Sequence, residues 1–364
     1  MIDQIIKEIA EKKKLAILYG AGLSRDSGVL TAPEIYEYIL SSVKDESGKV
    51  LIEKEIRNRI KEKSTPQMED FLMRIYDDLN IEKNKDEIFR DLFGFYNIGE
   101  PNDNHYFLAE LMKHDYVNWI YTTNFDLHFE NAYGPDFNKD VVSLYNPEDS
   151  GKHDKNGINC FEKMVKDDPN QRVYVKLHGC VKQFEEDDMI GTLLVKVASK
   201  KQVELIKKPI EMLFTTEDGG KNFHDAVLVM GYSCSDVYDI VKHIREICSD
   251  KNVNRKKVYL LMHQAEDEKP YAEKHQYFFN RYLDENSKRK NPFVTYDGKA
   301  SISFDGYVIY CNTSVFVKML SERKKVKIEE KAESDRKCNI AETASSIIRE
   351  WANRIQNADD LPFY

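Results

Sequence analysis

Apolar and polar positions alternate along this chain in patterns that predict helices and strands in turn. Isoleucines recur at helical spacing over residues 2–12, which predicts an amphipathic helix. The short apolar run at residues 15–19 follows at once and predicts a buried strand. This strand ends in the segment GAGLSRDSG, residues 20–28, whose small side chains indicate a tight loop.

Further apolar runs predict a series of strands, at residues 116–121, 141–145, 172–177, 226–231, 257–262 and 307–311. Helices are predicted between the later strands, at residues 201–214 and through Ile240, Ile244 and Ile247. Strands that are apolar on both faces and alternate with helices are typical of a parallel sheet. The chain is therefore predicted to have an α/β fold.

One long stretch departs from this alternation. Residues 33–115 are predicted to be mainly helical, whereas a standard nucleotide-binding unit returns to its second strand within about 30 residues. We therefore predict one domain over residues 1–325, with 33–115 as a helical insertion. The charge-dense remainder, residues 326–364, is predicted to be a linker followed by a C-terminal helix.

Composition narrows the class of protein. The chain has 364 residues, of which 41% are hydrophobic and 32% charged, and its formal net charge is −9. This acidic balance disfavours a dedicated nucleic-acid surface. No apolar run approaches the ~20 residues of a membrane span and no signal peptide is evident, so we expect a cytoplasmic protein. None of the six cysteines forms a C-x-x-C pair, so we expect reduced thiols and no metal site.

Four of the predicted strands end in polar or glycine-bearing sequences, which are GAGLSRDSG (20–28), TTNFD (122–126), HG (178–179) and GYSCSD (231–236). In open parallel sheets, ligands bind at the carboxyl ends of the strands. The first loop alone fits a strand-to-helix turn as well as a phosphate-binding loop, because it is neither G-x-G-x-x-G nor a P-loop. The convergence of four such ends predicts a binding site.

The four segments resemble, in order and spacing, the motifs of the sirtuin family over residues 14–240. GAGLSRDSG is similar to GAGxSxxSG, TTNFD to QNxD, HG to the catalytic His-Gly, and GYSCSD to GTSxxV. TTNFD and KLHG are closer to the bacterial SIR2-like branch, which includes NAD-degrading subunits of anti-phage defence systems. The resemblance implies a Rossmann-like parallel sheet of sirtuin type.

Departures from the sirtuin pattern bear on the activity. Residues 29–33 replace the usual Pro-Asp-Phe-Arg segment, and Thr123 stands where sirtuins carry glutamine. The four-cysteine zinc module of the deacylases has no counterpart here. These differences disfavour peptide deacylation and leave cleavage of the nicotinamide–ribose bond of NAD⁺ as the expected chemistry.

The resemblance also assigns roles to residues. Asn124 would hold a water or a ribose hydroxyl, and His178 would act as general base, since imidazole titrates near neutral pH. Asp126 would bind the nicotinamide carboxamide; its alternative is a helix N-cap, and that of Asn124 an Asx turn. His105 also matches a family position, but a packed or capping histidine is the better interpretation. The residues expected to line NAD⁺ are Gly20, Ala21, Gly22, Ser24, Ser27, Gly231 and Ser233.

The resulting hypothesis is an NAD⁺ glycohydrolase that yields nicotinamide and ADP-ribose, without a metal, as the effector of a bacterial abortive-infection system. Control of such an activity would require a homo-oligomer or a partner, such as a HerA-like ATPase or an Argonaute-type protein, and we expect no direct contact with nucleic acid or membrane. One alternative is a sensor or scaffold that binds NAD⁺ or ADP-ribose without turnover. Another is an ADP-ribosyltransferase or deacylase that uses the same site.

Overall fold

A computed structural model describes the parts of the chain that form its α/β core. These parts are residues 1–12, 14–24, 27–28, 98–144, 170–181, 200–216, 224–232, 240–250, 252–274, 294–296, 300–302, 304–327 and 346. All statements below concern these residues.

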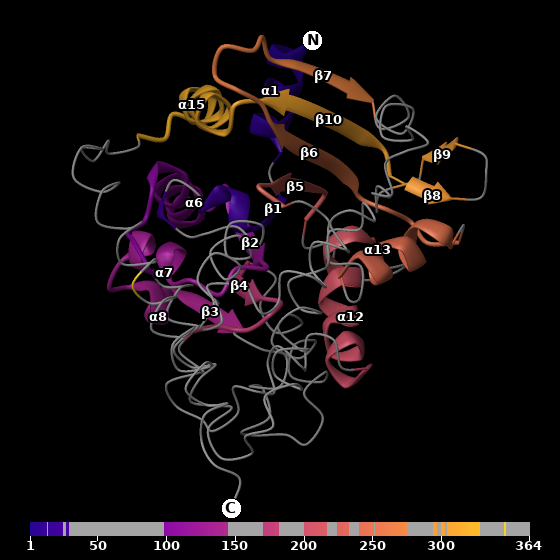
Figure 1. Cartoon of the computed structure of the whole chain (residues 1–364), viewed down its shortest axis with the longest axis horizontal. Helices are drawn as coiled ribbons and strands as arrows, with labels where there is room; N and C mark the ends of the chain where they lie inside the picture. Colours follow the sequence, from indigo (N-terminus) through magenta and orange to yellow (C-terminus); the bar gives the residue numbers. More distant parts are fainter. Residues whose placement is uncertain are drawn as a thin grey trace, which may run out of the picture.

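One eight-stranded sheet organises the described chain, in the order β3-β4-β2-β1-β5-β6-β10-β7 (Figure 1). All neighbouring strands are parallel except for β7, which pairs antiparallel with β10 at one edge. The strands are β1 (Leu15–Tyr19), β2 (Val117–Thr122), β3 (Val141–Leu144), β4 (Arg172–Lys176), β5 (Ala226–Met230), β6 (Lys257–His263), β7 (Tyr271–Lys274) and β10 (Gly306–Cys311). A separate antiparallel pair is formed by β8 (Val294–Tyr296) and β9 (Ala300–Ile302).

Helices cover both faces of this sheet (Figure 1). On one face lie α1 (Ile2–Glu11), α6 (Asp103–Lys113), α7 (His128–Tyr133), α8 (Phe137–Asp140) and α15 (Thr313–Lys324). On the other lie α12 (Lys200–Phe214) and α13 (Ile240–Ser249). The central strand β1 accordingly divides its side chains between two cores, with Leu15, Ile17 and Tyr19 in one and Ala16 and Leu18 in the other. Burial on both faces explains its uninterrupted apolar sequence.

The strand order changes direction at β1. The chain first builds outward on one side of β1, through β2 and β4, and then crosses to the other side for β5, β6 and β10. Apart from the edge strands β3 and β7, this is the 3-2-1-4-5-6 order of doubly wound nucleotide-binding sheets. Ligands of such sheets bind where the order reverses, at the carboxyl ends of the strands. A ligand site is therefore expected among the loops that follow β1, β2, β4 and β5.

Most elements of this fold match the sequence-based prediction. The helix at residues 2–12, all seven strands, the helix at 201–214 and the helix through Ile240 are confirmed to within two residues at their ends. The short strands β7, β8 and β9 and the helix α15 were not predicted. The α/β fold with a mainly parallel sheet is confirmed.

The proposed insertion and tail are described only in part. Within 33–115, the helix α6 packs its Phe107, Leu108 and Leu111 into the main core, while the preceding residues 33–97 lie outside the described chain. The charged segment that follows residue 325 is described to residue 327, and Ser346 is the other described residue of the tail. The domain boundaries therefore stay a prediction. None of the described helices is both long and apolar enough to cross a lipid bilayer.

Candidate functional site at the carboxyl ends of four parallel strands

The four strands whose ends carry the predicted motifs are immediate neighbours, in the order β4-β2-β1-β5. Because they are parallel, their carboxyl ends lie at one edge of the sheet. The loops that follow them are therefore adjacent in space, as the sequence predicts, and they form two pairs.

The loops after β1 and β5 are held together by backbone contacts. The amide of Gly20 donates to Met230 O (3.1 Å), and that of Gly22 donates to Gly231 O (2.8 Å). Gly231 has a φ of +58°, and a Cβ there would lie 2.3 Å from the Leu23 nitrogen. A Cβ on Gly20 or Gly22 would lie 2.9 Å from Gly231 O. The glycines thus let two main chains touch, and their contribution to ligand binding stays a prediction.

Ser24, within the loop after β1, lies at the centre of a buried hydrogen-bond network. Its Oγ is 2.9 Å from His105 Nε2, 2.8 Å from Asn124 Nδ2 and 3.1 Å from Asp126 Oδ2. A hydroxyl offers one donor and two acceptor lone pairs, so these three bonds use its full capacity. Ser24 therefore joins the first loop to the loop after β2 and to α6.

His105 fixes the direction of these bonds. Its Nδ1 faces the backbone N–H of Asn102 at 3.3 Å and must accept, so its Nε2 carries the proton and donates to Ser24. Burial, together with the nearby positive groups, lowers the pKa of His105 to about 3, so the ring is neutral at pH 7. His105 also occupies the N3 position of α6, where it forms a capping box with the N-cap residue Asn102. This confirms the interpretation of His105 as a packed and capping histidine.

Asp126 completes the network as an acceptor. Its Oδ2 accepts from Ser24 and Asn124, and its Oδ1 accepts the backbone N–H of His128 at the start of α7 (3.0 Å). Burial alone would raise the pKa of this carboxyl, but the neighbouring His128 and Lys176 and the backbone hydrogen bond lower it below its ordinary value. Asp126 is therefore an ionised carboxylate at neutral pH. It is not the N-cap of α7, which is Leu127, but it accepts the first N–H of that helix from one position earlier.

The carboxylate determines how the Asn124 amide is turned. The NH₂ group of Asn124 must face Asp126, since an amide oxygen 3.0 Å from a carboxylate oxygen would be repelled. Ser24 receives the second N–H of the same amide. The Asn124 Oδ1 atom consequently points away from this network, and it is buried without a hydrogen-bond partner among the described residues. Asn124 thus presents an acceptor at the carboxyl end of β2.

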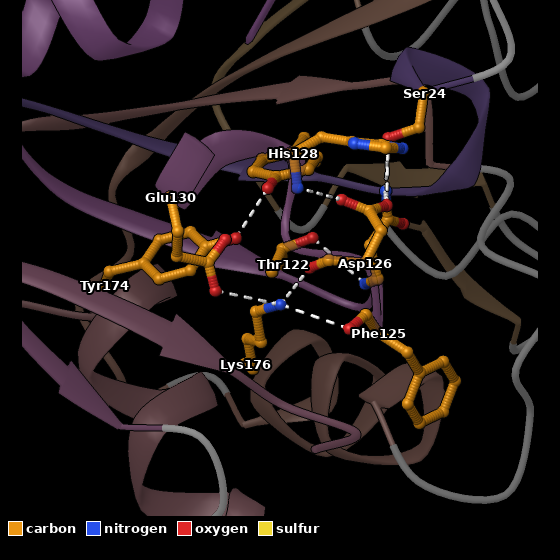
Figure 2. A network of polar contacts seen from close by, with 10 residues as sticks. Ser24, Thr122, Phe125, Asp126, His128, Glu130, Tyr174 and Lys176 are labelled. Atoms are coloured by element: carbon orange, nitrogen blue, oxygen red, sulfur yellow. Dashed lines mark hydrogen bonds and ion pairs between the residues drawn. The ribbon is translucent and has the colours of Figure 1, made fainter. Parts of the chain in front are cut away.

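A buried ion pair lies beneath the same loop. Lys176, at the end of β4, has no exposed side-chain surface and lies 3.1 Å from the Glu130 carboxylate of α7. Figure 2 shows its ammonium group between Glu130 on one side and the Phe125 carbonyl on the other. It donates to Phe125 O at 3.2 Å and to Asp126 O. Burial works against the charge, but Glu130 raises the pKa of Lys176 above its ordinary value, so the ammonium form persists.

His178 follows two residues after Lys176 and is buried. Its ring lies 6.2 Å from that of Phe125, centroid to centroid, so it is adjacent to the loop that carries Asn124. Gly179 has a φ of +99°, a conformation that glycine adopts freely and that turns the chain away after His178. The two residues predicted to be catalytic therefore come from neighbouring loops.

Three other residues were predicted to contact NAD⁺: Ala21, Ser27 and Ser233. Ala21 opens the short 3-10 turn η1 (Ala21–Leu23) at the end of β1, close to the network. Ser27 is buried, and its hydroxyl lies 3.4 Å from His105 Nδ1. Ser233 lies outside the described residues. Their roles in binding NAD⁺ stay predictions.

Lys176 and Glu130 are the site residues that the sequence analysis did not single out. A signal was present, because a lysine in a strand buried on both faces needs a partner for its charge. Among the described residues, no group of three or more His, Cys, Asp or Glu side chains could hold a metal ion.

Part of this chain matches the model of a known protein family. Residues 118–283 match the family model of the SIR2-like domain. The match covers somewhat less than half of the chain; it contains Asn124, Asp126, His178 and Gly231 and begins after the first glycine loop. Among curated protein sequences, none matches this chain.

Solved Sir2 structures also align with the chain. One, described as showing the structural basis for the mechanism and regulation of Sir2 enzymes, aligns at 14% identity and a TM-score of 0.34, covering 89% of this chain and 96% of its own. Two ADP-ribose complexes of single-residue variants of a Sir2 homologue each align at 12% identity and a TM-score of 0.28, over 100% of both chains. These TM-scores are low, and the α/β fold stands on the strand order of the sheet itself.

Proposed function

We propose that this protein is a SIR2-like NAD⁺ glycohydrolase, which cleaves the nicotinamide–ribose bond to give nicotinamide and ADP-ribose. The observation that carries the proposal is the orientation of Asn124. Its amide is fixed by Asp126 and Ser24, so that a buried, unpartnered acceptor atom lies at the carboxyl end of β2. The SIR2-like match, which covers both Asn124 and His178, supports NAD⁺ as the ligand.

The proposed chemistry follows from these groups. Departure of neutral nicotinamide takes the electron pair of the C1′–N bond and leaves oxocarbenium character at C1′. Asn124 Oδ1 would accept a hydrogen bond from the attacking water or from a ribose hydroxyl, and so fix its position. His178 would take the proton that the water loses as its oxygen bonds to C1′, a role that typically contributes ~10²–10⁴-fold.

The remaining predicted residues keep their proposed roles around NAD⁺. The loop residues Gly20, Ala21 and Gly22 and the side chain of Ser27 would lie along the diphosphate and ribose. Gly231 and Ser233 would close over the adenosine half. Asp126 and Ser24 would contribute mainly through the amide of Asn124, because their oxygens already accept or donate within the network.

The test is to incubate purified protein with NAD⁺ and to separate nicotinamide and ADP-ribose by chromatography. Wild type is expected to form both products in equal amounts, and His178→Ala to form them ~10²–10⁴-fold more slowly. Addition of candidate acceptor peptides should leave the rate unchanged, which separates hydrolysis from transfer or deacylation. A wild-type protein that binds NAD⁺ without releasing nicotinamide would contradict the proposal and favour a sensor.

The biological setting is a proposal that rests on the resemblance of TTNFD and KLHG to the bacterial SIR2-like branch. In that setting the protein would be a cytoplasmic effector of antiviral defence that acts by abortive infection. It would be restrained through a homo-oligomer or a partner such as a HerA-like ATPase. Light scattering together with the NAD⁺ assay tests this, because a monomer that is fully active alone would contradict the proposed control.

A further inference from the structure

The loop after β2 and the loop after β4 are joined by two main-chain hydrogen bonds and by the side chain of Lys176. The amide of Leu177 donates to Thr122 O (2.8 Å), which continues the parallel ladder one residue beyond β4. The amide of Val181 donates to Phe125 O (3.1 Å), beyond His178 and Asn124. In addition, the Lys176 ammonium donates to the carbonyls of Phe125 and Asp126.

These ties determine where Asn124 and His178 lie relative to each other. Asn124 precedes the two carbonyls that Lys176 holds, and His178 follows Lys176 by two residues. Phe125 O accepts from both Val181 and Lys176, so it joins the two loops at one atom. Without a donor from Lys176, the carbonyl of Asp126 would lose its bond to the neighbouring strand.

Glu130 explains how a charged group can do this inside the protein. Both side chains of the pair are almost completely buried, with exposed fractions of 0% and 5%. A buried ammonium is costly unless it is paired with an opposite charge and hydrogen-bonded. Glu130 supplies the charge and the two loop carbonyls supply acceptors, so the pair stabilises Lys176 in one position.

We propose that Lys176 is a positioning residue for the site: by holding the carbonyls of Phe125 and Asp126, it sets the separation of Asn124 and His178. The catalytic part of this inference rests on the proposed NAD⁺ cleavage, whereas its geometric part does not. Burial raises the pKa of Glu130, the neighbouring Lys176 charge opposes this rise, and Glu130 acts on the site through Lys176.

The test replaces the ion pair by apolar side chains of similar size. Exchange of a buried ion pair for well-packed hydrophobic residues is often neutral for stability, so Lys176→Met/Glu130→Met is expected to fold. It leaves the Phe125 and Asp126 carbonyls without the lysine. We expect kcat for nicotinamide release to fall by ~100-fold, with a smaller change in KM, because a displacement of about 1 Å can cost that much.

A second measurement reports on geometry without any activity. The side-chain amide resonances of Asn124, assigned by their loss in Asn124→Ala, are expected to shift or broaden in Lys176→Met/Glu130→Met. The matched control is Lys257→Met/Glu8→Met, which removes another Lys–Glu pair (2.6 Å) at the amino-terminal end of β6. This control should keep the wild-type rate and leave the Asn124 resonances in place.

The outcomes separate this inference from the proposed function. Wild-type protein that releases no nicotinamide contradicts the proposed function, and the Asn124 resonances then decide the inference alone. Unchanged resonances and unchanged kcat in a folded double variant would overturn it. If the double variant does not fold, Glu130→Gln decides, because the Glu130 charge is inferred to hold Lys176 in place: displaced Asn124 resonances in folded Glu130→Gln would support the inference, and unshifted resonances would overturn it.

Discussion

Two pairs of loops meet at the carboxyl edge of the sheet, and they are held by different means. Among the described residues, the loops after β1 and β5 contact each other through main-chain hydrogen bonds, with three glycines at the contact. The loops after β2 and β4 are joined by two main-chain bonds and also by the Lys176 ammonium, which pairs with Glu130, while the Asn124–Asp126–Ser24 network links the loop after β2 to the loop after β1. The first pair depends on the absence of side chains, whereas the second depends also on the orientation of side chains.

The two pairs of loops differ in whether they present a functional group to a ligand. A glycine contact fixes the distance between two chains but offers no group that a reaction can use. A side-chain network fixes which atom is presented, and here it leaves an acceptor, Asn124 Oδ1, without a partner in the described chain. Substitutions in the first pair should therefore act on stability, and substitutions in the second should act on both stability and activity.

The largest effect is expected for Gly231→Ala. The new Cβ would lie 2.3 Å from the Leu23 nitrogen, and the residue would keep a φ of +58°. Overpacking against backbone, with the added cost of a left-handed conformation, should lower the free energy of unfolding by about 2–4 kcal/mol. Urea denaturation followed by circular dichroism measures the change.

Gly134→Ala is the control for Gly231→Ala. Gly134 has a φ of +94°, but a Cβ there would meet nothing within 4 Å. Only backbone strain applies, and because its φ/ψ of +94°/−164° is nearly confined to glycine, the loss should be about 1–3 kcal/mol. Equal losses for the two variants would show that the contact between the loops after β1 and β5 contributes nothing.

A smaller loss of stability is expected for Ser24→Ala, which removes the centre of the side-chain network. His105 Nε2–H and one N–H of Asn124 would lose their acceptor in a buried place. Unsatisfied buried donors cost about 1–3 kcal/mol, and the freed Asn124 amide should also slow nicotinamide release. Ser321→Ala, which loses one hydrogen bond to Lys318 O, is the matched serine control and should keep wild-type activity. If Ser24→Ala released nicotinamide at the wild-type rate, the Ser24 hydrogen bond would not be needed to orient Asn124.

A loss of stability is also expected as the pH falls. The pKa of His105 falls to about 3 in the folded protein, so the unfolded chain binds the proton first as the pH drops below about 6.5. The His105 contribution to stability is therefore complete above pH 6.5 and is lost toward pH 3, by up to about 1.4 kcal/mol per pH unit. The buried His224, whose pKa is also lowered by burial, acts in the same direction.

His105→Gln tests the assignment of this pH dependence. Denaturant midpoints measured at pH 7.5 and pH 5 should differ less in the variant than in wild type, because the glutamine does not titrate. The same pH dependence in both proteins would show that His105 is not the group that becomes protonated on unfolding.

The sequence was sufficient to predict the glycine-bearing loop after β1 and the convergence of the four strand ends. Apolar runs such as residues 15–19 predict buried strands by themselves, and glycine is distinctive because only its conformational freedom allows two main chains to touch. The carboxyl ends of parallel strands then had to converge. The missed elements β7, β8 and β9 are only three or four residues long, too short for a hydrophobic period to show.

The side-chain network was harder to predict because it depends on residues far apart in the chain. Lys176 and Glu130 are 46 positions apart, and each is of a type that usually lies on the surface. Ser24 was predicted as a ligand contact, and the structure shows its hydroxyl engaged with His105, Asn124 and Asp126. Identities of polar residues thus indicated the site, whereas donor and acceptor directions required the three-dimensional contacts.

Nicotinamide release from saturating NAD⁺ by wild type and by Asn124→Ala tests the central claim most directly. The substitution removes the oriented acceptor and leaves His178 and the glycine loops in place. The account predicts that wild type releases nicotinamide, and that folded Asn124→Ala does so ~100-fold more slowly, because the water or ribose hydroxyl is no longer held in position. Equal rates from the two folded proteins would contradict it.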